Sequence, residues 1–216
     1  MVKRVKMKLA FTDFWDGFQP HNNFFLHLFG EIYKDVELVA PSEKFDVLIY
    51  SCFGDSHKKF DKNKVIKIFY AGEKFFIQGQ NAKVIEPNFE ECTYSFSYEF
   101  NEYEGKNVRI PLWLLQIDWF DKANYVNPEY VIPLNEIKDN EFIRTPKDKF
   151  CVFVNNSLFE NRIECIKKLE KYKKVDCYGK PFNNWFYGEL NKYKIISQYK
   201  FIVCFENFLY SGYHTE

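Results

Sequence analysis

Three short apolar runs alternate with two stretches of helical pattern between residues 150 and 205. The apolar runs are Phe150 to Val154, Val175 to Tyr178 and Phe201 to Phe205, and helices are expected at Glu160 to Tyr172 and around Glu189 to Ser197. The five consecutive apolar residues of the last run are too few for a helix and are typical of a strand buried on both faces. The order β-α-β-α-β predicts one half of a doubly wound α/β domain.

Polar residues begin where the last apolar run stops. Glu206 and Asn207 follow Phe205 at once. In an open α/β sheet the carboxyl ends of the strands form the crevice in which ligands bind, so this carboxylate and this amide are candidates for a binding site. The alternative is a strand end that is turned by an asparagine.

The first half of the chain carries a second set of short apolar runs. Strands are expected at residues 5–12, 36–40, 45–50, 65–70 and 93–98, with a helix at 22–34. Trp15 and Asp16 follow the first strand, where a loop faces the crevice; the alternative is an ordinary polar loop with a partly buried tryptophan. Glu73 follows the fourth strand directly after Gly72, and here the alternative is a solvated turn carboxylate.

Composition narrows the class of protein. The chain of 216 residues can form one large domain or two small ones, and 46% hydrophobic residues exclude a disordered protein. Thirty basic residues balance thirty acidic ones, so the chain has no net positive charge that would favour binding to nucleic acid. Six cysteines without C-x-x-C spacing predict reduced thiols, and the lack of a signal-peptide or membrane-spanning run predicts a soluble, cytoplasmic protein. Residues 121–147 hold three prolines and many charges, which predicts an interdomain linker.

Three segments near the end of the chain carry a family resemblance: SQYKF at 197–201, CFEN at 204–207 and GYHTE at 212–216. Together they resemble the donor-binding signature of the GDP-fucose-dependent α-1,3/1,4-fucosyltransferases, glycosyltransferase family 10, whose members read close to S-x-Y-K-F-x-x-x-F-E-N, a short loop and G-Y-x-T-E-K. AGE at 71–73 resembles the family's T-G-E-N, RIPL at 109–112 its R-x-P-L, and the segment from Asn155 to Arg162 its N-x(6)-R. A spaced match of this length is far more specific than a single glycine motif.

The resemblance implies the architecture called GT-B, which has two Rossmann-like α/β domains. We expect an acceptor-binding α/β domain at residues 1–147, ending in the linker, and a partial nucleotide-sugar-binding domain at 148–216. The chain stops one residue before the family's lysine, so we expect it to be truncated at the C-terminus.

The activity implied by the resemblance is an inverting transfer of L-fucose from GDP-fucose to a sugar hydroxyl, the 3-hydroxyl of a GlcNAc or Glc unit in a cell-surface glycan. Glu73 would be the general base, Glu216 would stabilise the oxocarbenium charge, and Trp15 and Asp16 would bind the acceptor. Arg162 would bind the diphosphate through its planar guanidinium, the alternative being a cation on the helix surface. The residues assigned to the donor are Asn155, Arg162, Tyr178, Gly179, Glu206, Asn207 and Tyr213.

No D-x-D sequence occurs, so we expect neither a metal nor any cofactor beside the GDP-fucose substrate. The expected partners are GDP-fucose and an oligosaccharide acceptor, with no nucleic acid; peripheral membrane contact would come from residues beyond this chain. Two alternatives stay open. One is a GT-B enzyme that uses another nucleotide sugar, and the other is a non-catalytic remnant that binds glycan or nucleotide.

Overall fold

The computed structural model describes residues 6–72, 86–122, 131–139, 141–157, 159–184 and 189–206. Four of the predicted site residues, Glu73, Asn207, Tyr213 and Glu216, lie outside these ranges. The described residues divide into two compact units, the first at 6–72 and 86–115 and the second from 116 onward. Each unit is described by itself. No described helix has the length and apolar character that crossing a bilayer requires.

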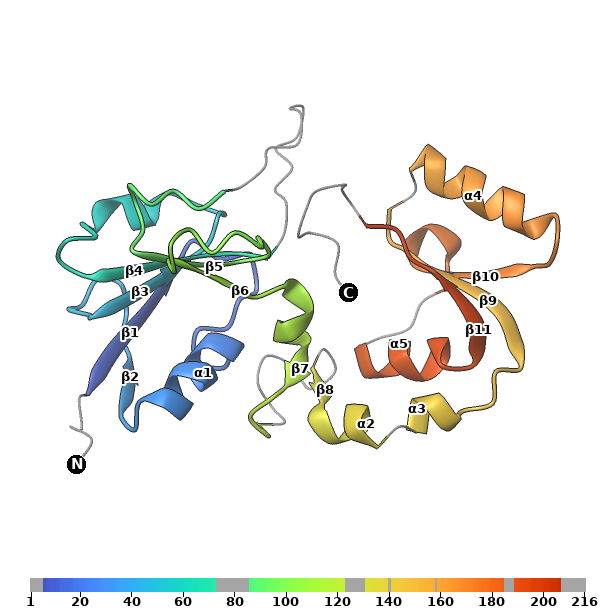
Figure 1. Ribbon diagram of the computed structural model, residues 1–216, viewed down its shortest axis with the longest axis horizontal. Helices are drawn as coiled ribbons and strands as arrows, with labels where there is room; N and C mark the ends of the chain where they lie inside the picture. The colour runs from blue at the N-terminus through green and yellow to red at the C-terminus, as the bar shows by residue number, and fades with distance from the viewer. Residues whose placement is uncertain are drawn as a thin grey trace. The chain divides into compact units, whose positions relative to one another are not determined.

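The first unit is built on a six-stranded sheet in which all neighbouring strands are parallel. In chain order its elements are β1 (Met7–Thr12), α1 (Phe24–Ile32), β2 (Val36–Leu38), β3 (Val47–Tyr50), the 3-10 helix η1 (Ser56–Lys59), β4 (Ile66–Ala71), β5 (Tyr94–Ser97), β6 (Asn107–Arg109) and the 3-10 helix η2 (Leu112–Gln116). The strand order is β2-β1-β3-β4-β5-β6, and Figure 1 shows α1 and η1 on opposite faces of this sheet. The strands and the helix predicted for this half are confirmed.

The sequence explains why α1 forms and where it packs. Asn23 caps the helix, since its side-chain oxygen accepts a hydrogen bond from the backbone N–H of Leu26 at 3.0 Å. The apolar face of the helix is buried, and the ring of Phe25 lies 4.8 Å from that of Tyr70 on β4. The helix is therefore held on the sheet by aromatic packing rather than by charge.

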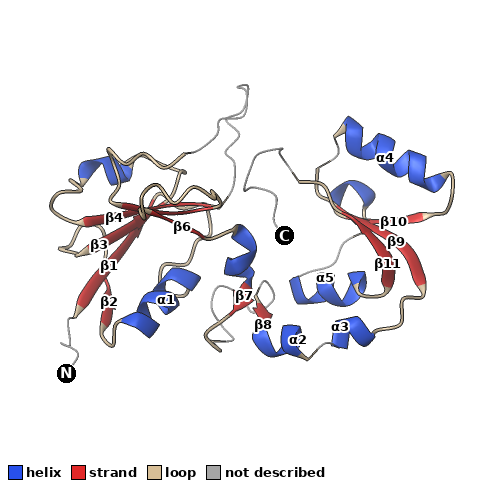
Figure 2. Cartoon of the chain, viewed as in Figure 1, coloured by secondary structure: helices blue, strands red, loops and turns tan. Residues whose placement is uncertain are grey.

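The second unit contains the predicted β-α-β-α-β order. Its elements are β7 (Ile117–Asp118), β8 (Ile132–Pro133), α2 (Leu134–Lys138), α3 (Glu141–Arg144), β9 (Lys149–Val154), α4 (Glu160–Glu170), β10 (Val175–Tyr178), the 3-10 helix η3 (Lys180–Phe182), α5 (Glu189–Ile196) and β11 (Tyr199–Val203). Strands β10, β9 and β11 form a parallel sheet in that order, and α4 and α5 lie on its opposite faces (Figure 2). Its core on the α4 face is Cys151, Phe153, Ile166 and Val175.

One prediction about this unit, the burial of the last strand, was wrong. The last strand runs from Tyr199 to Val203 and is not buried on both faces, because β11 is an edge strand among the described residues; Phe201 is 58% exposed and Ile202 46%. The segment expected as a linker contains β8, α2 and α3, and its described residues group with the second unit. The domain boundary at residue 147 stays a prediction.

Candidate functional site

Both sheets have the same order for their first three strands, with the third strand next to the first and on the opposite side from the second. In such sheets the chain reverses its direction of winding between the first and third strands, and ligands bind outside the carboxyl ends of the strands at this switch point. The switch points are β1 with β3 in the first unit and β9 with β11 in the second. Each is described in turn.

Arg162 joins the two strand ends at the switch point of the second unit. Its Nη1 donates to the side-chain oxygen of Asn155, which follows β9, at 2.9 Å and to the carbonyl of Ser157 at 3.1 Å. Its Nη2 donates to the carbonyl of Glu206, beyond β11, at 3.3 Å. Rings of Phe159 and Phe205 lie 4.8 Å and 5.9 Å from the guanidinium carbon. Three of the predicted donor residues are thus brought together.

The guanidinium is buried, and Arg162 is only 2% exposed. The alternative of a cation on the helix surface is therefore wrong. A guanidinium that is fixed by hydrogen bonds and aromatic rings has a defined orientation, which is what planar recognition of phosphate oxygens requires. The same bonds tie the β9 loop to the β11 loop, so Arg162 also has a structural role.

Gly179 allows the loop after β10 to approach this site. Its φ is +128°, and a Cβ there would lie 2.7 Å from the carbonyl carbon of Asn155 and closer still to the oxygen. The two loops are bonded to each other, since the N–H of Asn155 donates to the carbonyl of Tyr178 at 2.9 Å and the N–H of Lys180 donates to Asn156 Oδ1 at 3.2 Å. Gly179 therefore helps to position the asparagine that holds Arg162.

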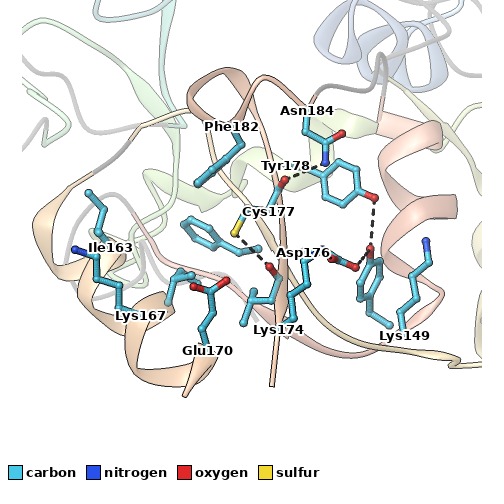
Figure 3. A pocket seen from close by; sticks show the side chains of 14 residues that line it. Lys149, Ile163, Lys167, Glu170, Lys174, Asp176, Cys177, Tyr178, Phe182 and Asn184 are labelled. Carbon is cyan, nitrogen blue, oxygen red and sulfur yellow. Dashed lines mark hydrogen bonds and ion pairs between the residues drawn. The ribbon is translucent and has the colours of Figure 1, made fainter. Parts of the chain in front are cut away.

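The side chain of Tyr178 points away from the Arg162 site. Its hydroxyl lies 3.4 Å from that of Tyr199, which in turn donates to Asp176 Oδ2 at 2.9 Å (Figure 3). These side chains line a cavity of about 650 Å³ around β10, whose opposite wall includes Ile163 and Phe182. Burial, together with these hydrogen bonds, raises the pKa of Tyr199. Tyr178 reaches the Arg162 site through its backbone carbonyl, and binding of the donor by its side chain stays a prediction.

The switch point of the first unit holds an aromatic cavity of about 290 Å³. Its lining comes from β4, from the loops after β1, β3 and β4, and from η2: Trp15, Ser51, Cys52, Phe53, Tyr70, Gly72 and Leu112. The rings of Trp15 and Phe53 meet edge to face at 6.2 Å. Gly72 leaves room for the end of the Tyr70 side chain, since a Cβ there would come within 2.9 Å of Tyr70 Cζ. Aromatic walls of this kind suit the apolar faces of a sugar ring.

The two residues predicted to bind the acceptor separate in the structure. Trp15 lines the cavity, whereas Asp16 is exposed and lies outside the lining. The buried carboxylate of this loop is Asp13, which contacts His57; His57 in turn contacts Glu91. Sequence analysis missed this cluster, and no local pattern marks residues that lie 44 and 34 positions apart.

Within the described ranges, no group of three or more His, Cys, Asp or Glu side chains is arranged to hold a metal ion. The expectation that transfer needs no metal stays a prediction.

Comparisons with known proteins identify the class. A crystal structure of an alpha1,3-fucosyltransferase matches all of this chain and 66% of that one with a TM-score of 0.64 at 20% identity. A crystal structure of alpha1,3-fucosyltransferase with GDP-fucose matches with a TM-score of 0.61, also at 20% identity, over all of this chain and 65% of that one. The fold is that of a GT-B glycosyltransferase, as predicted.

Two family models match the sequence itself. The alpha-(1,3)-fucosyltransferase FucT N-terminal domain covers residues 9–116, and the C-terminal model of glycosyltransferase family 10 (fucosyltransferase) covers residues 144–216. The chain belongs to the glycosyltransferase family 10 fucosyltransferases.

Curated relatives agree with this membership. The alpha-(1,3)-fucosyltransferase FucT of Helicobacter pylori is 24% identical over 238 aligned residues, which include 97% of this chain and 47% of that protein. A fucosyltransferase candidate of Acanthamoeba polyphaga mimivirus is 34% identical over 83 residues, 33% of this chain and 14% of that protein. The chain thus spans about half the length of the bacterial relative and a smaller part of the viral one.

Proposed function

We propose that this chain serves in the transfer of L-fucose from GDP-fucose to a hydroxyl of a glycan acceptor, O3 of a GlcNAc or Glc unit, with inversion at the transferred carbon. The observation that carries the proposal is the guanidinium of Arg162, held at a switch point by the loops that follow two neighbouring strands. A fork of N–H donors in this position can hold a diphosphate in a single orientation. Family membership supports fucose as the sugar.

The remaining roles follow the family pattern. Glu73 would take the proton of the acceptor hydroxyl, and its neighbour Gly72 lines the aromatic cavity in which Trp15 would contact the acceptor sugar. A positioned base contributes about 10² to 10⁴ in rate, so Glu73→Gln should lower turnover at least about a hundredfold and leave GDP-fucose affinity unchanged. A variant that keeps more than about a tenth of the turnover would remove Glu73 from this role.

Asn207, Tyr213 and Glu216 are proposed to complete the donor site, with Glu216 stabilising the oxocarbenium charge. Asp16, exposed beside the aromatic cavity, would reach an acceptor only from outside its wall. We further propose that transfer takes place in the cytoplasm and needs no metal. Turnover that survives excess EDTA would agree, and an absolute requirement for Mn²⁺ would contradict it.

Calorimetric titration of the chain with GDP-fucose, GDP-mannose and a UDP-sugar tests donor choice and the role of Arg162 together. Arg162→Lys keeps the charge and loses the fork, so GDP should bind about tenfold more weakly or worse. Lys168→Ala, an exposed lysine on the same helix, is the matched control and should bind as wild type does. Thermal unfolding of both variants separates lost binding from lost folding.

The outcomes distinguish the alternatives. Unchanged GDP affinity in folded Arg162→Lys would refute the phosphate role. Tighter binding of GDP-mannose or a UDP-sugar than of GDP-fucose would favour a GT-B enzyme that uses another donor. Binding of GDP-fucose without any turnover would favour the non-catalytic remnant.

A further inference from the structure

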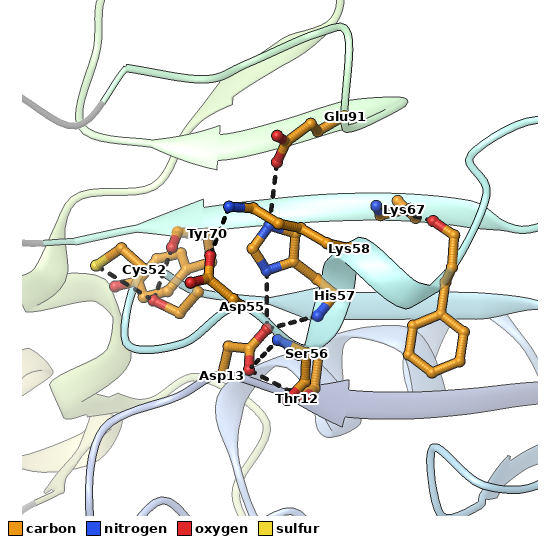
Figure 4. Close-up of polar contacts among 12 residues, drawn as sticks. Thr12, Asp13, Cys52, Asp55, Ser56, His57, Lys58, Lys67, Tyr70 and Glu91 are labelled. Carbon is orange, nitrogen blue, oxygen red and sulfur yellow. Dashed lines mark hydrogen bonds and ion pairs between the residues drawn. The ribbon is translucent and has the colours of Figure 1, made fainter.

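A charged cluster of Asp13, His57 and Glu91 lies in the first unit, and the side chain of Glu91 is 38% exposed (Figure 4). Asp13 directly follows β1, and its backbone has the left-handed conformation, with φ +58°. Its carboxylate accepts from the backbone N–H groups of Ser56 at 3.1 Å and His57 at 2.8 Å, and Oδ2 lies 2.8 Å from His57 Nδ1. On the other side of the ring, His57 Nε2 lies 3.1 Å from Glu91 Oε2. The side chains of Asp13 and His57 are 5% and 8% exposed.

The two ring nitrogens of His57 face one carboxylate each. Whether each ring nitrogen donates or accepts depends on which of them carries a proton. Burial by itself would raise the pKa of Asp13, but the hydrogen bonds from His57 and Ser56 outweigh it and hold that pKa below its ordinary value. His57 therefore lies between two carboxylates, each within hydrogen-bond distance of one ring nitrogen.

An aromatic ring and several charged groups lie near His57. The ring of Tyr50 on β3 stacks on His57 at 4.1 Å between centroids. On the 3-10 helix itself, Lys58 is paired with Asp55 at 2.7 Å. Lys67 on β4 lies beyond Tyr50, with its ammonium 5.4 Å from the Tyr50 centroid. The titratable and charged groups of this region are Asp13, Tyr50, Asp55, Lys58, Lys67, Glu91 and Cys92.

Asp13 connects this cluster to the cavity wall. Its backbone carbonyl accepts from the N–H of Phe53 at 3.1 Å, and it precedes Trp15 by two residues. Trp15 and Phe53 are the two aromatic rings that meet in the cavity lining. A change in the position of Asp13 would therefore move both walls.

We propose that Asp13, His57 and Glu91 are positioning residues that set the distance between Trp15 and Phe53 and so shape the acceptor-sugar subsite. That the cavity binds an acceptor sugar rests on the proposed function, whereas the positioning of Trp15 and Phe53 does not. Loss of either contact of His57 would release the β1 loop or the segment before β5.

Hydrogen–deuterium exchange of the whole chain tests the positioning without any ligand. In His57→Ala the amides of residues 13–18 and 51–57 should exchange at least about tenfold faster, since a hydrogen bond to a charged group is lost, while amides of β9 keep their wild-type rates. His57→Asn places an N–H near the Nδ1 position and should restore much of the protection at Asp13, though not at Glu91. His21→Ala, the same change at an exposed histidine, is the control.

Binding gives the second readout. N-acetylglucosamine should bind His57→Ala about tenfold more weakly than wild type, with GDP affinity unchanged and with partial recovery in His57→Asn. Unchanged exchange of residues 13–18 and 51–57 in His57→Ala would overturn the proposal. Faster exchange in a chain that binds no acceptor sugar would confirm the positioning role and refute the proposed function of the cavity.

Discussion

Replacement of Gly179 by alanine should destabilise the second unit by more than backbone strain alone. The φ of +128° lies in a region that only glycine adopts readily, which costs alanine about 1 to 3 kcal/mol. The new Cβ would also lie 2.7 Å from the carbonyl carbon of Asn155, so the Asn155 backbone must move and its 2.9 Å hydrogen bond to Tyr178 should weaken, for about 1 kcal/mol more. We expect a total loss of about 2 to 4 kcal/mol.

Gly105→Ala is the matched control. Gly105 also has a positive φ, +80°, but a Cβ there meets nothing within 4 Å, so only strain of about 1 to 2 kcal/mol is expected. Urea unfolding followed by hydrogen exchange in β9 and β1 reports each unit separately. Equal losses in the two variants would refute the close approach of Gly179 to Asn155. A folded Gly179→Ala should also bind GDP more weakly, because Asn155 holds the guanidinium of Arg162.

Three further predictions concern stability and reactivity. Gly30 is exposed on α1, and a methyl group added there would meet nothing within 4 Å, so Gly30→Ala should gain up to about 1 kcal/mol of stability, measured by urea unfolding; a loss would contradict its helical setting. The pKa of Asp13 is held below its ordinary value of 3.8. Ionised Asp13 therefore stabilises the folded chain above pH 3.8, and this stabilisation is lost as the pH falls below that value. Asp13→Asn should flatten the acidic part of the curve of unfolding free energy against pH. Burial raises the pKa of Cys92 to about 11, so iodoacetamide at pH 8 should label exposed Cys204 well before Cys92. Equal labelling rates of the two cysteines in the folded chain would exclude a buried Cys92 thiol.

The strands and the larger helices could be predicted because their signals are local. A run such as the one at β9 shows its apolar character within six residues, and α4 shows its periodicity within eleven. The grouping of Asn155, Arg162 and Glu206 also followed from local facts, since parallel strands place their carboxyl ends at one edge of the sheet. The structure brings these three residues together, and their roles toward a donor stay predictions.

The features that sequence analysis missed depend on partners distant in the chain. Asp13 and His57 meet because β1 and β3 are neighbours, and no pattern near either residue records that pairing. The prediction chose Asp16 from the same loop, but the left-handed turn at Asp13 directs Asp13 inward and leaves Asp16 in solvent. The predicted burial of β11 was wrong for a similar reason, since the sequence of a strand does not indicate how many strands lie beside it in the sheet.

Among the described residues the outer side of β11 pairs with no strand, and this bears on how the chain behaves at high concentration. The edge strands β2 and β6 have three residues each, so a strand of another molecule could pair with them over a short length only. In contrast, β11 has five residues and exposes Phe201 and Ile202. Self-association on concentrating the purified chain should therefore begin at β11, and a lysine in place of Ile202 should delay it by adding a charge where two edges would meet.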